Sequence, residues 1–237
     1  MGKRLDLLGL LYPRTCPVCQ KKLNFSGKLS CAACECGLKL IKEPRCMKCG
    51  KNVEDETIEY CFDCVKNQHV YDYGRSLFLY NEDIRKSIYR FKYAGKKEYG
   101  DFYGYMLARH LGEEIRNMGC DLIVPVPLHK KKEIKRGYNQ AAVIAKVMGR
   151  ELCIPVDDKL LIRTKNTRPQ KEMDKSERKK NVENAFKINK DIVKCKGIVL
   201  VDDIYTTGST IDACAAVLKR AGIPKVCYVS LSIGTGV

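Results

Sequence analysis

Two adjacent aspartates and a hydroxyl-rich loop stand together near the end of the chain. Asp202 and Asp203 follow the apolar run 198–201, and a loop of small hydroxyl residues and one glycine comes next. Carboxylates suit sugar hydroxyls or a divalent cation, whereas the N–H groups that open a helix hold a phosphate. The pattern indicates a site for a phosphorylated sugar, whose phosphate would meet Thr206, Thr207, Gly208, Ser209 and Thr210.

The order of these features outweighs a plainer interpretation of the aspartates. Most Asp-Asp pairs cap a helix or pair with nearby lysines. Here a buried strand precedes the pair, and periodic apolar residues from 211 to 218 indicate a helix after the loop. Open α/β sheets place their ligands at the carboxyl ends of strands, where both acids fall.

A repeat of cysteines fills the N-terminal part of the chain. Nine of the 14 cysteines precede residue 65, and one set of four recurs thirty residues later with every interval preserved. Two C-x-x-C pairs per copy are typical of a zinc ribbon. The odd count and the lack of a signal-peptide pattern disfavour disulfides. We therefore expect two structural zinc ions, held by Cys16, Cys19, Cys31 and Cys34, and by Cys46, Cys49, Cys61 and Cys64.

One cysteine of this region has no counterpart in the repeat. The position thirty residues after Cys36 is Lys66, so the repeat makes Cys36 the spare thiol. An exchange with Cys34 as the fourth ligand stays open at this point.

The elements that must position these residues alternate between strand and helix. The sequence predicts strands at 77–80, 121–127, 198–201 and 226–233, with helices at 84–91 and 140–147. A strand pair at 159–163 and 185–188 flanks the polar segment 164–184. This alternation implies a parallel α/β core. We expect an N-terminal helix and double zinc ribbon at 1–70, and an α/β domain at 71–237.

The chain carries a strong positive charge. Its 44 basic and 28 acidic residues give a net charge of +16, which indicates an anionic ligand or polymer. Segment 128–180 holds 16 basic and 7 acidic residues, and aromatic and basic residues interleave at 89–93. This pattern suits single-stranded nucleic acid, although a solvated helix face is the plainer reading. The expected nucleic-acid contacts are Arg136, Lys171, Lys175, Lys179 and Lys180.

The three histidines give little support to a hydrolase that combines Ser or Cys with His. His69 falls in the linker after the cysteines and His110 on a helix, where each is expected to be solvated or packed. His129 alone lies in a candidate site, the basic loop 129–132. Because this loop follows a strand and precedes a helix, it is a second phosphate-binding arrangement.

With these pieces in place, the chain resembles the ComF family over nearly its whole length. That family combines a double zinc ribbon with a type I phosphoribosyltransferase domain, whose sheet is Rossmann-like and parallel. The resemblance rests on the four C-x-x-C pairs and on segments 91–93, 124–128, 136–140, 169–170, 178–182 and 201–208.

The resemblance implies the ligand and the role of each loop. Phosphoribosyl pyrophosphate (PRPP) would bind with magnesium, and Asp202 and Asp203 would hold its ribose hydroxyls as the catalytic residues. The loop 206–210 would hold the 5′-phosphate, and segment 164–184 would form a flap. The pyrophosphate loop would consist of Pro127, Leu128, His129 and Lys130.

Two functions follow from the resemblance. In the first, the protein binds PRPP and acts with single-stranded DNA in natural transformation, with proteins of the competence machinery as partners. The expected location is the cytoplasm, at the inner face of the membrane, since no apolar run has transmembrane length. In the alternative, it is an active phosphoribosyltransferase on an unidentified base or other small acceptor, with no DNA role.

Overall fold

The computed structural model describes residues 13–23, 27–165, 185–189 and 194–234. The helix expected at the N-terminus and most of the polar segment 164–184 lie outside these residues. Among the helices that the structure describes, none is long and apolar enough to cross a membrane.

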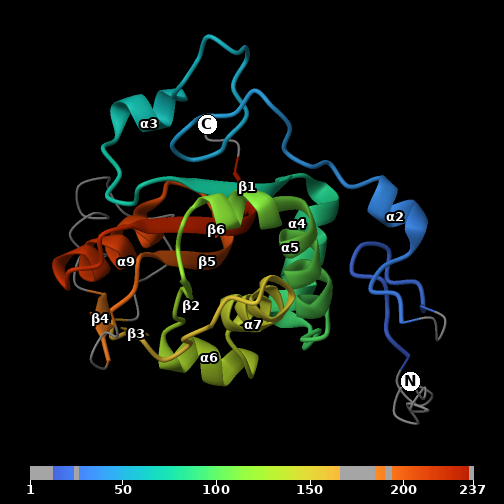
Figure 1. The fold of residues 1–237 in the computed structure, drawn as a ribbon. Helices are drawn as coiled ribbons and strands as arrows, with labels where there is room; N and C mark the ends of the chain where they lie inside the picture. The colour runs from blue at the N-terminus through green and yellow to red at the C-terminus, as the bar shows by residue number, and fades with distance from the viewer. Residues whose placement is uncertain (1–12, 24–26, 166–184, 190–193, 235–237) are drawn as a thin grey trace.

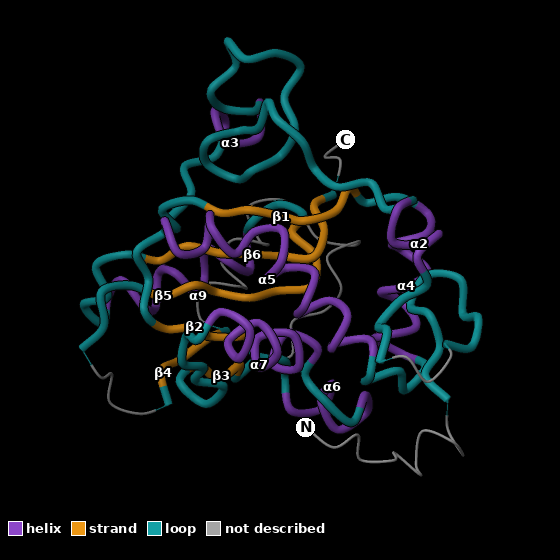
Figure 2. The backbone as a smooth tube through the Cα atoms, turned by 45° about the vertical axis from the view of Figure 1, so that its right-hand side comes forward, coloured by secondary structure: helices purple, strands orange, loops and turns teal. Residues whose placement is uncertain are grey.

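A four-stranded parallel sheet forms the centre of the α/β domain. Its strands are β1 (Gly74–Leu79), β2 (Leu122–Pro125), β5 (Ile198–Tyr205) and β6 (Val226–Ile233). They lie in the order β1-β6-β5-β2, which Figure 2 shows from top to bottom. Because every neighbouring pair is parallel, the carboxyl ends of the strands lie at one end of the sheet.

Apolar side chains cover both faces of the sheet. Along β5, Val199 and Val201 join one core cluster, whereas Ile198 and Leu200 join the other, as strand alternation requires. The first face carries α4 (Glu82–Tyr93), α5 (Tyr99–Asn117) and α7 (Gln140–Leu152), and the second carries α9 (Ser209–Arg220) and the hairpin of β3 (Leu161–Arg163) and β4 (Phe186–Ile188) (Figure 1). The predicted fold class, a parallel α/β domain after a zinc-ribbon module, is confirmed.

Two segments differ from the sequence prediction. The basic loop expected at 129–132 is mostly the start of helix α6 (Lys130–Arg136). His129 caps this helix by accepting a hydrogen bond from the N–H of Lys131, and Gly137 ends it in the left-handed conformation. Helix α7 continues past 147 to Leu152, where Cys153 takes the left-handed conformation.

The two cysteine copies pack at different places on the domain (Figures 1 and 2). Each contains one short helix, α2 (Ala32–Cys36) in the first copy and α3 (Phe62–Lys66) in the second. The first copy lies beside α4, where Ser87 Oγ and Arg90 Nη2 both donate to the carbonyl of Pro17. The second lies against β6, where Tyr228 Oη donates to the carbonyl of Cys49 over 2.8 Å.

The segment between the two copies covers the outer edge of β1. The N–H of Ile41 donates to the carbonyl of Leu77, and the N–H of Leu79 donates to the carbonyl of Lys39, each over 3.0 Å. The zinc-ribbon module thus supplies hydrogen bonds to a strand edge that solvent would otherwise meet.

Candidate functional site

The two predicted aspartates lie in the carboxyl-terminal half of β5, which continues to Tyr205, and point to opposite faces of the sheet. Asp203 faces α4, where its Oδ1 lies 2.8 Å from Nζ of Lys92. The side chains of this ion pair are only 14% and 18% exposed. Asp202 lies on the other face, close to Arg163 of β3 and Cys214 of α9. The strand end therefore presents one carboxylate to each side.

Asp202 has a strongly altered proton affinity. Burial raises the pKa of its carboxyl to about 7, and the neighbouring charge of Asp203 adds to the rise. Its Oδ1 accepts a hydrogen bond from the N–H of Asp203 over 2.8 Å. A cation or a hydroxyl donor placed here would favour the charged carboxylate.

The loop after β5 packs tightly at its glycine. Gly208 has a φ of 76° and lies directly before the first turn of α9. A Cβ at this position would lie 2.6 Å from Oη of Tyr205 and 2.9 Å from Cε1 of His69, so a larger residue would displace the loop. Of the remaining predicted loop residues, Thr206 and Thr207 are exposed, and Ser209 and Thr210 are half-buried.

His69, from the linker after the second cysteine copy, packs against this loop. Its Nδ1 lies 2.7 Å from Oδ2 of Asp212 in α9, and the N–H of Val70 donates to the other carboxylate oxygen over 2.8 Å. The His69 side chain is 3% exposed. The sequence placed His69 in the linker, either solvated or packed, and no spacing in the sequence indicated that it would contact the candidate phosphate loop.

The second predicted loop follows β2, which is the parallel neighbour of β5. Asn139 holds this loop, because its Nδ2 donates to the carbonyl of Val126 over 3.0 Å. The loop and the aspartates lie at the same end of the sheet. Within the loop, Pro127 is buried, Leu128 and His129 are half-buried, and Lys130 is exposed.

A group of cations lies between these elements. Burial lowers the pKa of Lys132, and the charges of Arg163, Arg136 and Lys92 lower it further because they lie nearby. An anion bound among them would relieve this repulsion. Of these four residues the sequence singled out only Arg136 for binding. Lys92 lies in segment 91–93 and Lys132 in the basic run, but nothing in the sequence indicated Arg163.

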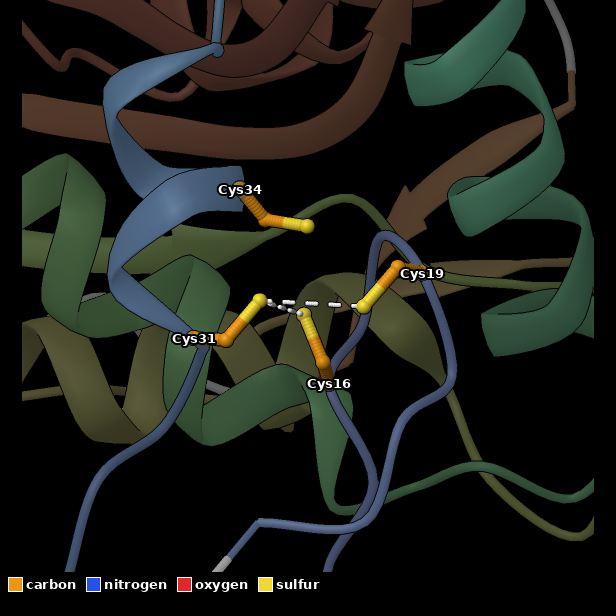
Figure 3. A group of neighbouring side chains, drawn as sticks. All are labelled: Cys16, Cys19, Cys31 and Cys34. Carbon is orange, nitrogen blue, oxygen red and sulfur yellow. Dashed lines mark hydrogen bonds between the residues drawn. The ribbon is translucent and has the colours of Figure 1, made fainter.

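Each cysteine copy gathers four thiols around one point, as Figure 3 shows for the first. Sγ of Cys31 lies 3.7 Å from Sγ of both Cys16 and Cys19, and in the second copy Cys49 and Cys61 are 3.6 Å apart. A tetrahedral zinc ion with Zn–S bonds of about 2.3 Å holds its sulfurs about 3.8 Å apart. The groups, each with all sulfurs within 4.8 Å of one another, are Cys16, Cys19, Cys31 and Cys34, and Cys46, Cys49, Cys61 and Cys64.

The backbone of the two copies follows the repeat as well. Gln20 and Gly50, thirty residues apart, have φ values of 64° and 72°. Each donates its N–H over 2.9 Å to the carbonyl of the first cysteine of its copy, Cys16 or Cys46. Cys36 is exposed and belongs to neither group. Cys34 therefore completes the first group of four thiols.

The nucleic-acid contacts predicted from charge divide between two regions. Arg136 lies in α6 among the cations described above. The other four, Lys171, Lys175, Lys179 and Lys180, lie outside the residues that the structure describes.

Comparisons with known proteins identify the cysteine repeat directly. Residues 7–65 match the family model of the double zinc ribbon domain. Among solved structures, glutamine PRPP amidotransferase of Bacillus subtilis aligns with 55% of this chain and 25% of its own length, at 20% identity and a TM-score of 0.37. A purine phosphoribosyltransferase of Pyrococcus horikoshii aligns with 55% of this chain and 83% of its own, at 16% identity and a TM-score of 0.35.

Three curated proteins are similar over most of the chain. Competence protein F of Haemophilus influenzae is 28% identical over 89% of this chain and 93% of its own length. Competence protein ComFC of Bacillus subtilis is 28% identical over 81% and 78%, and DNA utilization protein YhgH of Escherichia coli is 26% identical over 92% and 96%. The double zinc ribbon and these relatives bear out the resemblance of the chain to the ComF family.

Proposed function

We propose that the protein binds PRPP with magnesium at the carboxyl end of β5. One observation carries the proposal: strand β5 bears two carboxylates, Asp202 and Asp203, in its carboxyl-terminal half and runs on through Tyr205 into the glycine loop that opens α9. The carboxylates suit the ribose hydroxyls, and the N–H groups of the loop suit the 5′-phosphate. The loop 127–130 and the nearby cations would then bind the pyrophosphate.

Magnesium fits the donors that are present. Two carboxylates are the hard oxygen ligands that this ion takes from protein, with the remaining positions supplied by water and ligand phosphates. Asp203 already pairs with Lys92, so the ion and the lysine would share this carboxylate. When bound, magnesium neutralises charge on the pyrophosphate.

The charges are arranged to favour transfer of the phosphoribosyl group. As the bond from ribose C1 to pyrophosphate breaks, positive charge grows on the sugar and the leaving group keeps the bonding electrons. In the proposed binding mode, Asp202 and Asp203 would stabilise the charge on the sugar, and cations such as Lys132 would stabilise the charge on the leaving group. This arrangement favours turnover on an acceptor as the second candidate function, and measuring pyrophosphate release with candidate bases and with single-stranded DNA tests it.

Thermal denaturation with PRPP and magnesium tests the binding proposal. A ligand at about a hundred times its Kd stabilises the native state by about 2.7 kcal/mol, which a melting curve resolves. The double variant Asp202→Asn/Asp203→Asn should lose the shift, whereas Asp83→Asn, an exposed acid in the first turn of α4, should keep it. An unchanged melting temperature of the wild-type protein in excess PRPP would overturn the proposal.

We also propose that the protein acts with single-stranded DNA during natural transformation. Support comes from the relatives named for competence and DNA utilization and from the net charge of +16. This role implies a cytoplasmic location at the inner face of the membrane, and partners in the competence machinery.

Binding of a single-stranded oligonucleotide of arbitrary sequence, measured at several salt concentrations, tests the DNA role. Affinity should fall steeply as salt rises, because each phosphate that is neutralised releases counterions. Reversing four charges with Lys171→Glu, Lys175→Glu, Lys179→Glu and Lys180→Glu should weaken binding and flatten the salt dependence, with zinc content unchanged. No binding at low salt would remove DNA from the proposal and leave PRPP binding intact.

A further inference from the structure

Two exposed tyrosines stand on the outer face of α4, beside the candidate PRPP site. The buried side of this helix carries Ile84, Ile88 and Phe91. On the opposite side, Tyr89 and Tyr93 are 63% and 56% exposed, and their ring centroids lie 4.9 Å apart. Spacing of four residues brings the two rings together on one face.

A guanidinium from α6 extends this aromatic surface. The Cζ of Arg136 lies 4.9 Å from the ring centroid of Tyr93, and its Nη2 donates to the Tyr93 hydroxyl over 3.0 Å. The other terminal nitrogen of the guanidinium, Nη1, donates to Oε1 of Gln140 over 3.0 Å and so fixes the group further. The two rings are tilted by 49° to one another, and with the fixed guanidinium they form an exposed aromatic and cationic cluster, which we call the tyrosine platform (Tyr89, Tyr93 and Arg136).

The platform adjoins the aspartates through one residue. Lys92, which precedes Tyr93 in α4, forms the ion pair with Asp203. On the other side, Lys130, Lys131 and Lys135 are exposed on α6. Exposed rings that contact a lysine-rich helix match the two parts of a nucleic-acid strand, since bases stack on aromatic rings and phosphates pair with cations.

We infer that the tyrosine platform stacks an unpaired base of single-stranded DNA next to the PRPP site. This inference rests on the DNA role proposed above and names where that strand is held. In a duplex, both faces of every base are already covered by neighbouring bases, so only an unpaired base offers a free face. The adjacent lysines favour a strand over a free base, because a neutral heterocycle has no phosphate to place there.

Fluorescence of 2-aminopurine in a short thymine oligonucleotide tests this inference. Stacking of that base on the platform should quench its emission, and Tyr89→Ala/Tyr93→Ala should abolish the quenching and weaken binding by about tenfold or more, the loss typical of one stacked base. Tyr89→Phe/Tyr93→Phe keeps the rings and should bind within about threefold of wild type. Tyr60→Ala, which removes an exposed tyrosine from the second cysteine copy, should change nothing.

Several outcomes would overturn the inference. These are unchanged quenching and affinity in the alanine double variant, an equal loss in the phenylalanine double variant, and quenching of free 2-aminopurine or a labelled duplex as strong as that of the oligonucleotide. The PRPP-induced melting shift, measured on the same variants, should stay at its wild-type size. If the alanine double variant keeps the quenching while the wild-type protein shows the PRPP-induced shift, this inference fails and PRPP binding stands.

Discussion

His69 Nδ1 lies 2.7 Å from Oδ2 of Asp212, and this contact joins the linker after the second zinc ribbon to the first turn of α9. A second linker residue, Tyr71, also contacts this region, because its hydroxyl lies 2.8 Å from that of Tyr205 at the end of β5. Tyr205 in turn stacks on Tyr228 at 4.8 Å. The candidate phosphate loop is therefore supported from the side of the zinc ribbon.

Replacing His69 by alanine should loosen this support. The variant leaves the half-buried carboxylate of Asp212 without its ring partner, which costs about 1–3 kcal/mol of unfolding free energy. PRPP affinity should fall as well, because the loop loses a packing surface at Gly208. Isothermal titration and denaturant unfolding measure the two effects. His110→Ala, on the exposed side of α5, is the matched control, and equal behaviour of both variants would show that His69 does not position the loop.

Gly208→Val should abolish binding of PRPP without unfolding the sheet. The branched side chain would meet Tyr205 and His69 at less than 3 Å, and its φ of 76° is strained for any residue except glycine. The measurement is the melting shift with PRPP and magnesium. Gly95→Val, at an exposed glycine with φ of 67° and open space around it, carries the same backbone strain away from the site and should retain the shift.

Zinc analysis should return two ions per chain. Cys36→Ser should leave both, because this thiol belongs to neither group. Cys19→Ser and Cys46→Ser should each lose one, but with unequal effects on the fold. Cys46 is fully buried in the core that faces α9, whereas Cys19 is exposed. We therefore expect Cys46→Ser to lower the melting temperature more, and the reverse order would contradict this assignment.

Asp202 should make the stability of the free protein depend on pH. Its pKa is raised to about 7 in the native state, so between about pH 4 and pH 7 the folded chain keeps a proton that the unfolded chain has lost. Stability should fall as pH rises through that window and level off above it. Asp202→Asn retains an oxygen for the N–H of Asp203 and should be more stable than wild type at pH 8, by up to a few kcal/mol.

Asp203→Asn provides the contrast to that experiment. It removes the partner of Lys92 from a largely buried ion pair, and so it should destabilise the protein at pH 8. Urea unfolding at pH 5 and pH 8 compares the two variants. Identical pH profiles for wild type and Asp202→Asn would exclude Asp202 as the titrating group.

The sequence predicted the parts of this protein whose signal is local. The four branched apolar residues of 198–201 predicted a strand covered on both faces, and in the structure they pack into two core clusters. The cysteine spacing likewise determined both groups of four thiols. Contacts between distant segments have no such signal. Lys92 of α4 pairs with Asp203 of β5, and His69 contacts Asp212 across 143 residues, because the fold brings these distant segments together. The loop at 129–132 was wrong because its helix depends on a cap by His129 and a stop at Gly137.

The position of β6 has a consequence for how the chain assembles. Gly74 of β1 pairs with Tyr228 of β6. Strand β1 therefore cannot pair with β6 until most of the domain has been synthesised. Such long separations slow folding. Meanwhile the segment around Leu40 is available at once to bond the other edge of β1. We expect a metal-loaded ribbon to block that edge early, so that β6 can enter on one side only and mispairing with a second nascent chain is avoided.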